Sequence, residues 1–186
     1  PRPSELLTKA ALRNASVILQ ATSGSTNALV HLAAIAGRAG ITYDLQELDR
    51  VGRDVPVLLD LKPAGMNFME DFHAGGSLPS LWRRLKDHLD LSAKTVNGET
   101  IGEIVARWPA YVDDKVIRPL DNPLVKSEAI AILSGNLAPG GAAIKLASAT
   151  PSLFQHEGPA VVFDSLEDLE KRIDDPDLNV TPQTVM

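Results

Sequence analysis

Apolar positions in the first 90 residues follow helical spacing, interrupted by one short, continuous apolar run. The periodicity predicts three amphipathic helices, over residues 4–20, 28–39 and 77–90. A short helix over 44–52 is indicated by Asp44 and Glu47, whose spacing resembles a capping box. The run at 55–61, VPVLLDL, is typical of a strand that is buried on both faces. This order of elements predicts part of a layered α/β domain.

The pattern changes after about residue 95. An Asn-Gly dipeptide within 95–100 predicts a hairpin with a type I′ turn, and residues 101–108 predict a short helix that ends at Pro109. Four β-prone runs separated by turn residues follow, at 116–120, 129–133, 142–147 and 160–163. A last helix is expected over 165–173. We therefore place a domain boundary within 108–125 and expect a β-rich module with one covering helix after it.

Composition narrows the class of protein. The 186 residues, 44% apolar and 23% charged, suit one or two ordinary domains with a real core and exclude a disordered or collagen-like chain. No apolar run approaches the roughly 20 residues that span a bilayer. Since no secretory signal is readable either, we expect a cytoplasmic protein without membrane contact. A net charge of −6, scattered basic residues and few aromatic residues disfavour nucleic-acid binding.

Metal-ligand patterns are missing from the sequence. The chain contains no cysteine, which excludes disulfides, thiolate metal sites, iron–sulfur ligation and a cysteine nucleophile within it. None of the four histidines has a partner at a spacing such as His-x-x-x-His, so no zinc site is predicted. His31 lies in an apolar helical segment, and we expect it in the core or at an interface.

The first candidate site is the polar segment 23–27, SGSTN, at the start of a predicted helix. Free backbone N–H groups and the helix dipole attract carboxylates and phosphates there, and hydroxyl groups add donors. The segment is neither a P-loop nor a nucleophile elbow, because it lacks their glycine patterns. Ser25, Thr26 and Asn27 are therefore candidates for lining a substrate site, and plain helix capping is the alternative.

The second candidate is residues 69–76, MEDFHAGG, which follow the loop after the buried run. Open α/β sheets place their ligand sites at the loops that follow the carboxyl ends of their strands. Glu70, Asp71 and His73 could serve acid–base chemistry or bind a metal ion. The alternative is a solvated loop that leads into a helix.

A third glycine-rich segment, 134–141, precedes Lys145. Its composition favours a tight turn between two strands over a ligand-binding loop. No catalytic residue is assigned from this segment.

Three ordered motifs together resemble the dihydroxy-acid, 6-phosphogluconate and sugar-acid dehydratases. The motifs are SGSTNALVHL at residues 23–32, MEDFHAGG at 69–76 and GNLAPGGAAIK at 135–145, and residues 156–165 are similar to a further segment of that family. The residues at 136–141, together with DLKPAG at 60–65, are nearer the sugar-acid (aldonate) branch.

The resemblance implies a lyase that removes water from a 2,3-dihydroxy carboxylic acid and yields a 2-keto-3-deoxy acid. This chemistry needs a Lewis acid on the 3-hydroxyl and a base for the C2 proton. The resemblance implies a 2Fe–2S cluster held by three cysteines for the first role, Mg²⁺ that organises the substrate, and a serine alkoxide as the base. It also implies a homo-oligomer with an N-terminal α/β domain and a β-rich, swivelling C-terminal domain.

The cysteine and base-serine motifs of that family are absent here, and the chain begins at Pro1 rather than Met. We therefore expect a central segment of such an enzyme, in which 1–110 ends the first domain and 111–186 begins the second. No catalytic or metal-ligating residue is assigned, and the isolated chain is expected to be inactive. Two other functions stay open: a binding module for small carboxylates or phosphorylated sugars, and a subunit-interface domain without catalysis.

Overall fold

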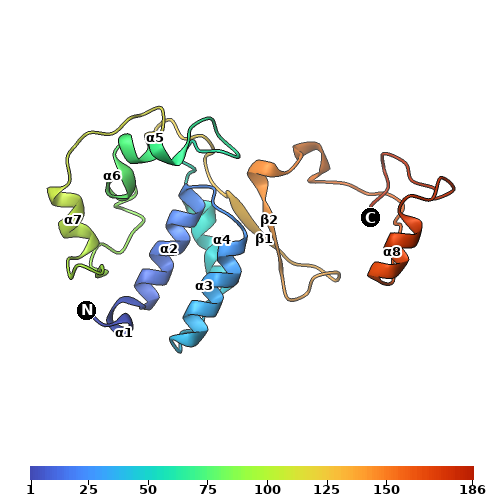
Figure 1. The fold of residues 1–186 in the computed structure, drawn as a ribbon, viewed down its shortest axis with the longest axis horizontal. Coiled ribbons are helices and arrows are strands. Elements are labelled where there is room, and N and C mark those ends of the chain that lie inside the picture. Colours follow the sequence, from blue (N-terminus) through green and yellow to red (C-terminus); the bar gives the residue numbers. More distant parts are fainter. The chain divides into compact units, whose positions relative to one another are not determined.

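The computed structural model describes residues 1–186, which form two compact units, Pro1–Ala149 and Thr150–Met186. The first unit contains α1 (Pro3–Leu6), α2 (Lys9–Ala21), α3 (Asn27–Arg38), α4 (Leu45–Asp54), α5 (Met69–Ala74), α6 (Ser77–Arg84), α7 (Ile101–Arg107), β1 (Ile130–Leu133), β2 (Ala142–Lys145) and the 3-10 turn η1 (Leu146–Ser148) (Figure 1). The second unit contains η2 (Pro151–Leu153) and α8 (Leu166–Arg172). The fold is mixed helix and strand, with one small sheet. No helix has the length and apolar character that crossing a membrane requires.

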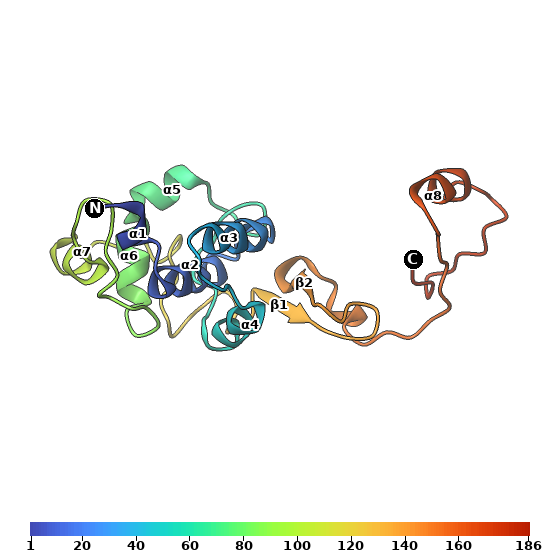
Figure 2. The same ribbon diagram turned by 90° about the horizontal axis from the view of Figure 1, so that it is seen from below.

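Helix α2 packs against both α3 and α4, and α4 packs against β1 (Figures 1 and 2). The helices predicted at 28–39 and 44–52 are confirmed. The helix predicted over 4–20 is interrupted, because the Thr8 side chain accepts the Ala11 amide hydrogen at 3.1 Å and starts α2 anew. Asp44 caps α4 by accepting from the Gln46 amide at 2.9 Å.

Two clusters of buried side chains form the core of the first unit. The larger cluster contains Val17, Ala21, Val51, Val55, Leu58, Leu59, Leu81, Leu85, Leu89, Val116 and Ile117. The smaller one contains Leu19, Leu29, Leu48 and Ile130. Burying one such leucine or isoleucine contributes about 1.5–3 kcal/mol. Strand β1 is thereby anchored to three helices through Ile130. His31 is exposed on α3, so its predicted place in the core is wrong, and its place at an interface stays a prediction.

The run predicted as a buried strand is extended and buried, but it belongs to no sheet. Its main chain pairs with residues 116–125 through isolated bridges, Val57 with Val125 and Leu59 with Ile117. The Leu58 amide instead donates to the last residue of α2, at 2.8 Å. One side of the run is therefore occupied by a helix end, which leaves no room for a neighbouring strand there.

Helix α6 ends at Arg84, before the predicted end at residue 90. The main chain of Asp90 is held by Asn14 on α2, which accepts from the Asp90 amide at 2.8 Å and donates to its carbonyl at 2.9 Å. Asp90 therefore lies outside the helix and is fixed to α2. The short helix predicted over 101–108 is confirmed as α7.

The hairpin predicted over 95–100 is present, with Lys94 bridged to Thr100. Its turn is not type I′, because Gly98 has a positive φ of 89° and Asn97 does not. The Gly98 amide donates to the Thr95 carbonyl at 3.0 Å, which gives a three-residue loop closed by a left-handed glycine.

Strands β1 and β2 form an antiparallel hairpin in which Ile130 faces Lys145 and Leu133 faces Ala142. The glycine-rich segment between them is the predicted turn. In the second unit, α8 is confirmed with Ser165 as its cap, but the run predicted at 160–163 makes a single bridge to Val185.

Candidate functional site

A cleft of about 590 Å³ in the first unit lies where the end of α2 meets the start of α3. Its lining residues are Ile18, Thr22, Ser23, Gly24, Ser25, Thr26, Leu59, Leu61, Lys62, Pro63, Met69, Phe72, Leu78, Lys145 and Ser148. The three motifs of the family resemblance, at 23–32, 69–76 and 135–145, each contribute at least one residue to this lining. The polar residues that line the cleft are serines, threonines and two lysines, and no aspartate or glutamate is among them.

Ser23 follows the end of α2 and has a left-handed backbone conformation, with φ of 46°. The residue is 8% exposed, and its hydroxyl has no hydrogen-bond partner. An unpaired buried hydroxyl costs about 1–3 kcal/mol. Strained backbone and unsatisfied polar groups gather at functional positions, and both occur here at a residue that lines the cleft.

The turn before α3 leaves backbone donors free. Ser25 Oγ accepts the Asn27 amide hydrogen at 3.2 Å, whereas the amide groups of Ser25 and Thr26 donate to no protein acceptor. The Thr26 hydroxyl makes no capping bond. The positive end of the α3 dipole also lies at this turn. Free N–H groups at a helix N-terminus favour an anion.

Two lysines bring positive charge to the cleft lining. Lys62 Nζ lies 4.2 Å from the centroid of the Phe68 ring, within reach of a cation–π interaction. Lys145 is the last residue of β2. Neither lysine forms an ion pair with a carboxylate. Both ammonium groups are thus free to bind an anionic ligand.

The structure separates the residues predicted for the second segment from the cleft. Glu70, Asp71 and His73 are exposed on α5 and do not line it. The Asp71 carboxylate accepts from the Phe68 amide at 2.7 Å, and His73 Nδ1 lies 3.2 Å from Ser77 Oγ. This segment is a short helix rather than a loop.

Other residues take the place of those side chains in the cleft. Helix α5 contributes Met69 and Phe72 to the lining, and Asn27 lines a neighbouring cavity instead. The sequence motifs predict no binding role for Lys62 or Ser148. The motif that contains Lys62 was visible as DLKPAG, but nothing local to Ser148 indicates a site.

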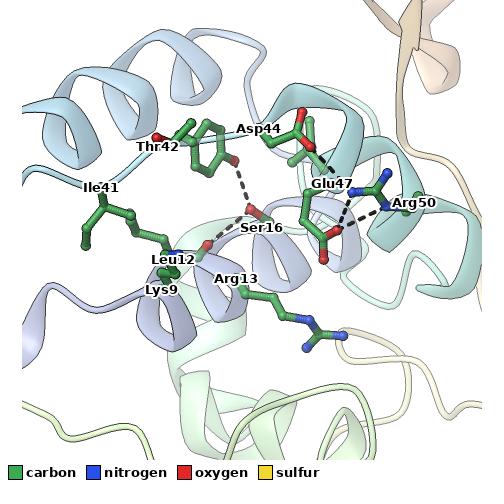
Figure 3. Close-up of a pocket in the computed structure, with 11 residues that line it drawn as sticks. Lys9, Leu12, Arg13, Ser16, Ile41, Thr42, Asp44, Glu47 and Arg50 are labelled. Carbon is green, nitrogen blue, oxygen red and sulfur yellow. Dashed lines mark hydrogen bonds and ion pairs between the residues drawn. The ribbon is translucent and has the colours of Figure 1, made fainter.

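A second cavity, of about 320 Å³, lies between α2 and α4 (Figure 3). The hydroxyl groups of Ser16 and Tyr43 are 2.8 Å apart, and burial raises the pKa of the Tyr43 phenol. Arg50 donates to the Glu47 carboxylate at 2.7 Å. These polar groups satisfy one another, in contrast with Ser23 in the first cleft.

Comparison with known proteins gives the chain's family. The family models for the N-terminal and C-terminal parts of dihydroxy-acid/6-phosphogluconate dehydratases match residues 1–104 and 115–186. The chain belongs to the dihydroxy-acid/6-phosphogluconate dehydratase family. The sequence resemblance to that family is confirmed, because the two models together match most of the chain.

The relatives of this chain include sugar-acid dehydratases and dihydroxy-acid dehydratases. The chain is 45% identical to a 6-deoxy-6-sulfo-D-gluconate dehydratase of Pseudomonas putida, over 100% of the chain and 32% of the relative. It is 45% identical to an L-arabonate dehydratase of Azospirillum brasilense, over 98% and 32%. It is 41% identical to a dihydroxy-acid dehydratase of Methanospirillum hungatei, over 89% and 30%. The chain thus spans about a third of the length of these relatives.

The cofactors that the family resemblance implies do not fit the residues of this dehydratase-family chain. It has no cysteine to supply thiolates for an iron–sulfur cluster. No group of three or more histidine, cysteine, aspartate or glutamate side chains is placed to hold a metal ion. What the arrangement can do is bind an anion through hydroxyl, amide and ammonium donors.

Proposed function

We propose that the chain is a central segment of a hydro-lyase that dehydrates a sugar acid or a 2,3-dihydroxy acid to a 2-keto-3-deoxy acid, and that the cleft binds the substrate's carboxylate. The observation that carries the proposal is the lining, which offers unpaired donors and cations without a carboxylate. Relatives named as sugar-acid and dihydroxy-acid dehydratases support the reaction class.

The donors of the cleft suit a carboxylate in number and kind. Its oxygen atoms accept from the Ser25 and Thr26 amides at the positive end of α3, and Lys145 adds a charge-assisted bond. The Ser23 hydroxyl gains the acceptor that it lacks. Phe72 and the other apolar lining side chains reduce competition from water.

The chemical step requires more than this cleft. The C2 proton leaves to a base, the 3-hydroxyl leaves, and the resulting enol tautomerises to the 2-keto acid. The residues described here fit neither the base nor the Lewis acid. We therefore propose that the 2Fe–2S cluster, Mg²⁺ and the base serine belong to other parts of a longer enzyme, and that the isolated chain is inactive.

The remaining proposals concern the longer enzyme. We propose that 1–110 belongs to a layered α/β domain and 111–186 to a β-rich domain, and that the assembled enzyme is a cytoplasmic homo-oligomer. The two family models support this division, since they leave 105–114 between them. We also propose that the exposed face of α5, with Glu70, Asp71 and His73, and Asn27 at the start of α3 adjoin the active site of that enzyme.

A binding module for small carboxylates or phosphorylated sugars is the second candidate. The observation that favours it is the set of free amides at the start of α3, because such donors also bind phosphate. A phosphorylated sugar without a carboxylate, glucose 6-phosphate, separates the two candidates. Tighter binding of glucose 6-phosphate than of an aldonate supports the module over the dehydratase site.

Calorimetric titration of the 186-residue chain tests the carboxylate site. L-Arabonate and L-arabitol share their other hydroxyl groups, but the alcohol lacks the carboxylate. We expect the acid to bind and the alcohol not to bind. Lys145→Met weakens binding about tenfold or more through loss of a charge-assisted bond. Lys9→Met, in the second cavity, is the matched control and leaves affinity unchanged. Equal heats from acid and alcohol, or no binding of either, contradict the proposal.

A further inference from the structure

We infer that Gln20 is a positioning residue that sets the place of Lys145 relative to the donors of Ser25 and Thr26. The inference rests on the proposed carboxylate site. Gln20 lies on α2 close before those donors and is fully buried. Its Nε2 donates to the Ile130 carbonyl at 2.8 Å, and its Oε1 accepts from the Ile130 amide at 2.9 Å. The side-chain amide therefore pairs with β1 as a neighbouring strand would.

Ile130 transmits this attachment to the lysine. Ile130 and Lys145 are direct partners in the antiparallel hairpin. Such partners have Cβ atoms about 4.5–5.5 Å apart on one face of the sheet. The Leu146 amide also donates to the Ala129 carbonyl at 3.0 Å, which fixes the chain just after the lysine. Fixing the main chain of Ile130 therefore fixes the start of the Lys145 side chain.

A second attachment lies further along the same strand edge. The Ile132 amide donates to Asp49 Oδ1 at 2.9 Å. Alternate residues of an antiparallel strand direct their amide and carbonyl groups to the same edge, so Ile130 and Ile132 both face the helices. Side chains of α2 and α4 thus occupy the edge that a third strand would take. Of the two attachments, Gln20 is the one at the partner of Lys145.

Helix α4 also confines the Gln20 amide. A Cβ atom at Gly52 would lie 2.5 Å from Gln20 Nε2. Real Cβ atoms essentially never approach so closely, so Gly52→Ala displaces the amide without removing it. This variant perturbs the positioning while every hydrogen-bonding group stays in the chain.

Helix α2 supplies a matched control. Asn14 is 5% exposed and makes the same reciprocal pair with the main chain of Asp90, at 2.9 Å and 2.8 Å. Asn14 does not line the cleft. Gln20→Leu and Asn14→Leu therefore each remove two bonds between a side-chain amide and the main chain, buried for Gln20 and partly buried for Asn14. Only Gln20→Leu removes bonds to Ile130, the strand partner of Lys145.

The first experiment measures position directly. Since the chain has no cysteine, two can be introduced for spin labels at exposed Val30 on α3 and Leu137 in the hairpin turn. We expect one narrow distance distribution between the labels, broadened or shifted by Gln20→Leu and by Gly52→Ala. Asn14→Leu leaves it unchanged. A distribution that Gln20→Leu does not alter overturns the inference.

The second experiment measures L-arabonate affinity in a double-mutant cycle. Gln20→Leu weakens binding about fivefold or more by misplacing a charged donor, while Asn14→Leu does not. In a Lys145→Met background the Gln20→Leu effect disappears, because the two changes are coupled. Additive effects, or equal effects of Gln20→Leu and Asn14→Leu, overturn the inference. If Gln20→Leu does not fold, Gly52→Ala takes its place.

Absence of L-arabonate binding by the unaltered chain contradicts the proposed function rather than this inference. The distances between the spin labels then test the positioning role of Gln20 by themselves.

Discussion

Asn14 and Asp90 exchange two hydrogen bonds, although 76 positions separate them. Further along the same helix, Gln20 repeats this arrangement with Ile130. A primary amide offers one donor side and one acceptor side, as a peptide group does, so it can pair with main chain where no strand is present. Helix α2 in this way fixes two distant segments of the chain.

Replacement of Asn14 tests this role in stability. Asn14→Leu removes both hydrogen bonds to the main chain of Asp90, each worth about 1 kcal/mol, so we expect the free energy of unfolding to fall by about 2 kcal/mol. Urea denaturation followed by circular dichroism measures it. Lys9→Gln, exposed on the same helix, should stay within about 0.5 kcal/mol. A fully stable Asn14→Leu variant contradicts the role.

Asp49 offers a graded test of the attachment at Ile132. Asp49 Oδ1 accepts from the Ile132 amide, and Oδ2 accepts from Arg53 at 2.7 Å. Asp49→Leu removes both and should lower the free energy of unfolding by about 2–3 kcal/mol. Asp49→Asn keeps the first acceptor and should lower it by about 1 kcal/mol. Equal losses in the two variants would show that the bond to Ile132 contributes nothing.

Tyr43 gives the chain an alkaline dependence of stability. Burial raises the pKa of its phenol, while the hydrogen bond with Ser16 lowers it in part. The folded state thus favours the neutral phenol. The contribution of the neutral Tyr43 phenol to the free energy of unfolding is complete below the pKa of a tyrosine in the unfolded chain, about 10. This contribution is lost as pH rises through the pKa of Tyr43 in the folded chain. We expect unfolding free energies of the unaltered chain and Tyr43→Phe, measured from pH 7 to 11, to converge at the alkaline end. A constant difference contradicts this assignment.

Gly65 shapes the loop that carries Lys62. A Cβ atom there would lie 2.1 Å from Asp60 Oδ1 and 2.6 Å from the Leu61 amide nitrogen. Gly65→Ala should lower the free energy of unfolding by about 1–3 kcal/mol and weaken L-arabonate binding. Gly98→Ala is the control. Its Cβ meets no atom within 4 Å, so only its left-handed backbone, at a cost of about 1 kcal/mol, is affected. Scanning calorimetry measures the stability of each variant, and titration calorimetry measures its affinity for L-arabonate. Unchanged affinity in Gly65→Ala would show that this loop does not contribute to binding.

Local signals predicted part of the fold. Helix α3, with its apolar periodicity, and helix α8, capped by Ser165, lie where the sequence indicates them, and so does the glycine-rich turn between β1 and β2. The run at 55–61 is buried as its composition indicates. Its pairing could not be predicted, because its partners are a helix end and residues 116–125.

In the candidate site, too, features set by local sequence could be predicted and features set by tertiary packing could not. The polar segment before α3 could be recognised from its residues, since free donors at a helix start follow from local sequence. The pairing of Gln20 with Ile130 joins residues 110 positions apart, and the burial of the unpaired Ser23 hydroxyl also depends on tertiary packing. The residue types of Glu70, Asp71 and His73 predict a site, but these side chains are exposed outside the cleft, whereas apolar Phe72 of the same helix lines it.

The central claim is that the cleft between α2, α3 and β2 binds a sugar-acid carboxylate. Titration of the ¹⁵N-labelled 186-residue chain with L-arabonate tests it most directly, with the amide signal of each residue followed by NMR. We predict saturable shifts of the Ser25, Thr26 and Lys145 amides, and none at Tyr43 or Glu47 in the second cavity. Shifts confined to the second cavity, or no saturable shift at Ser25 and Thr26, would contradict the claim.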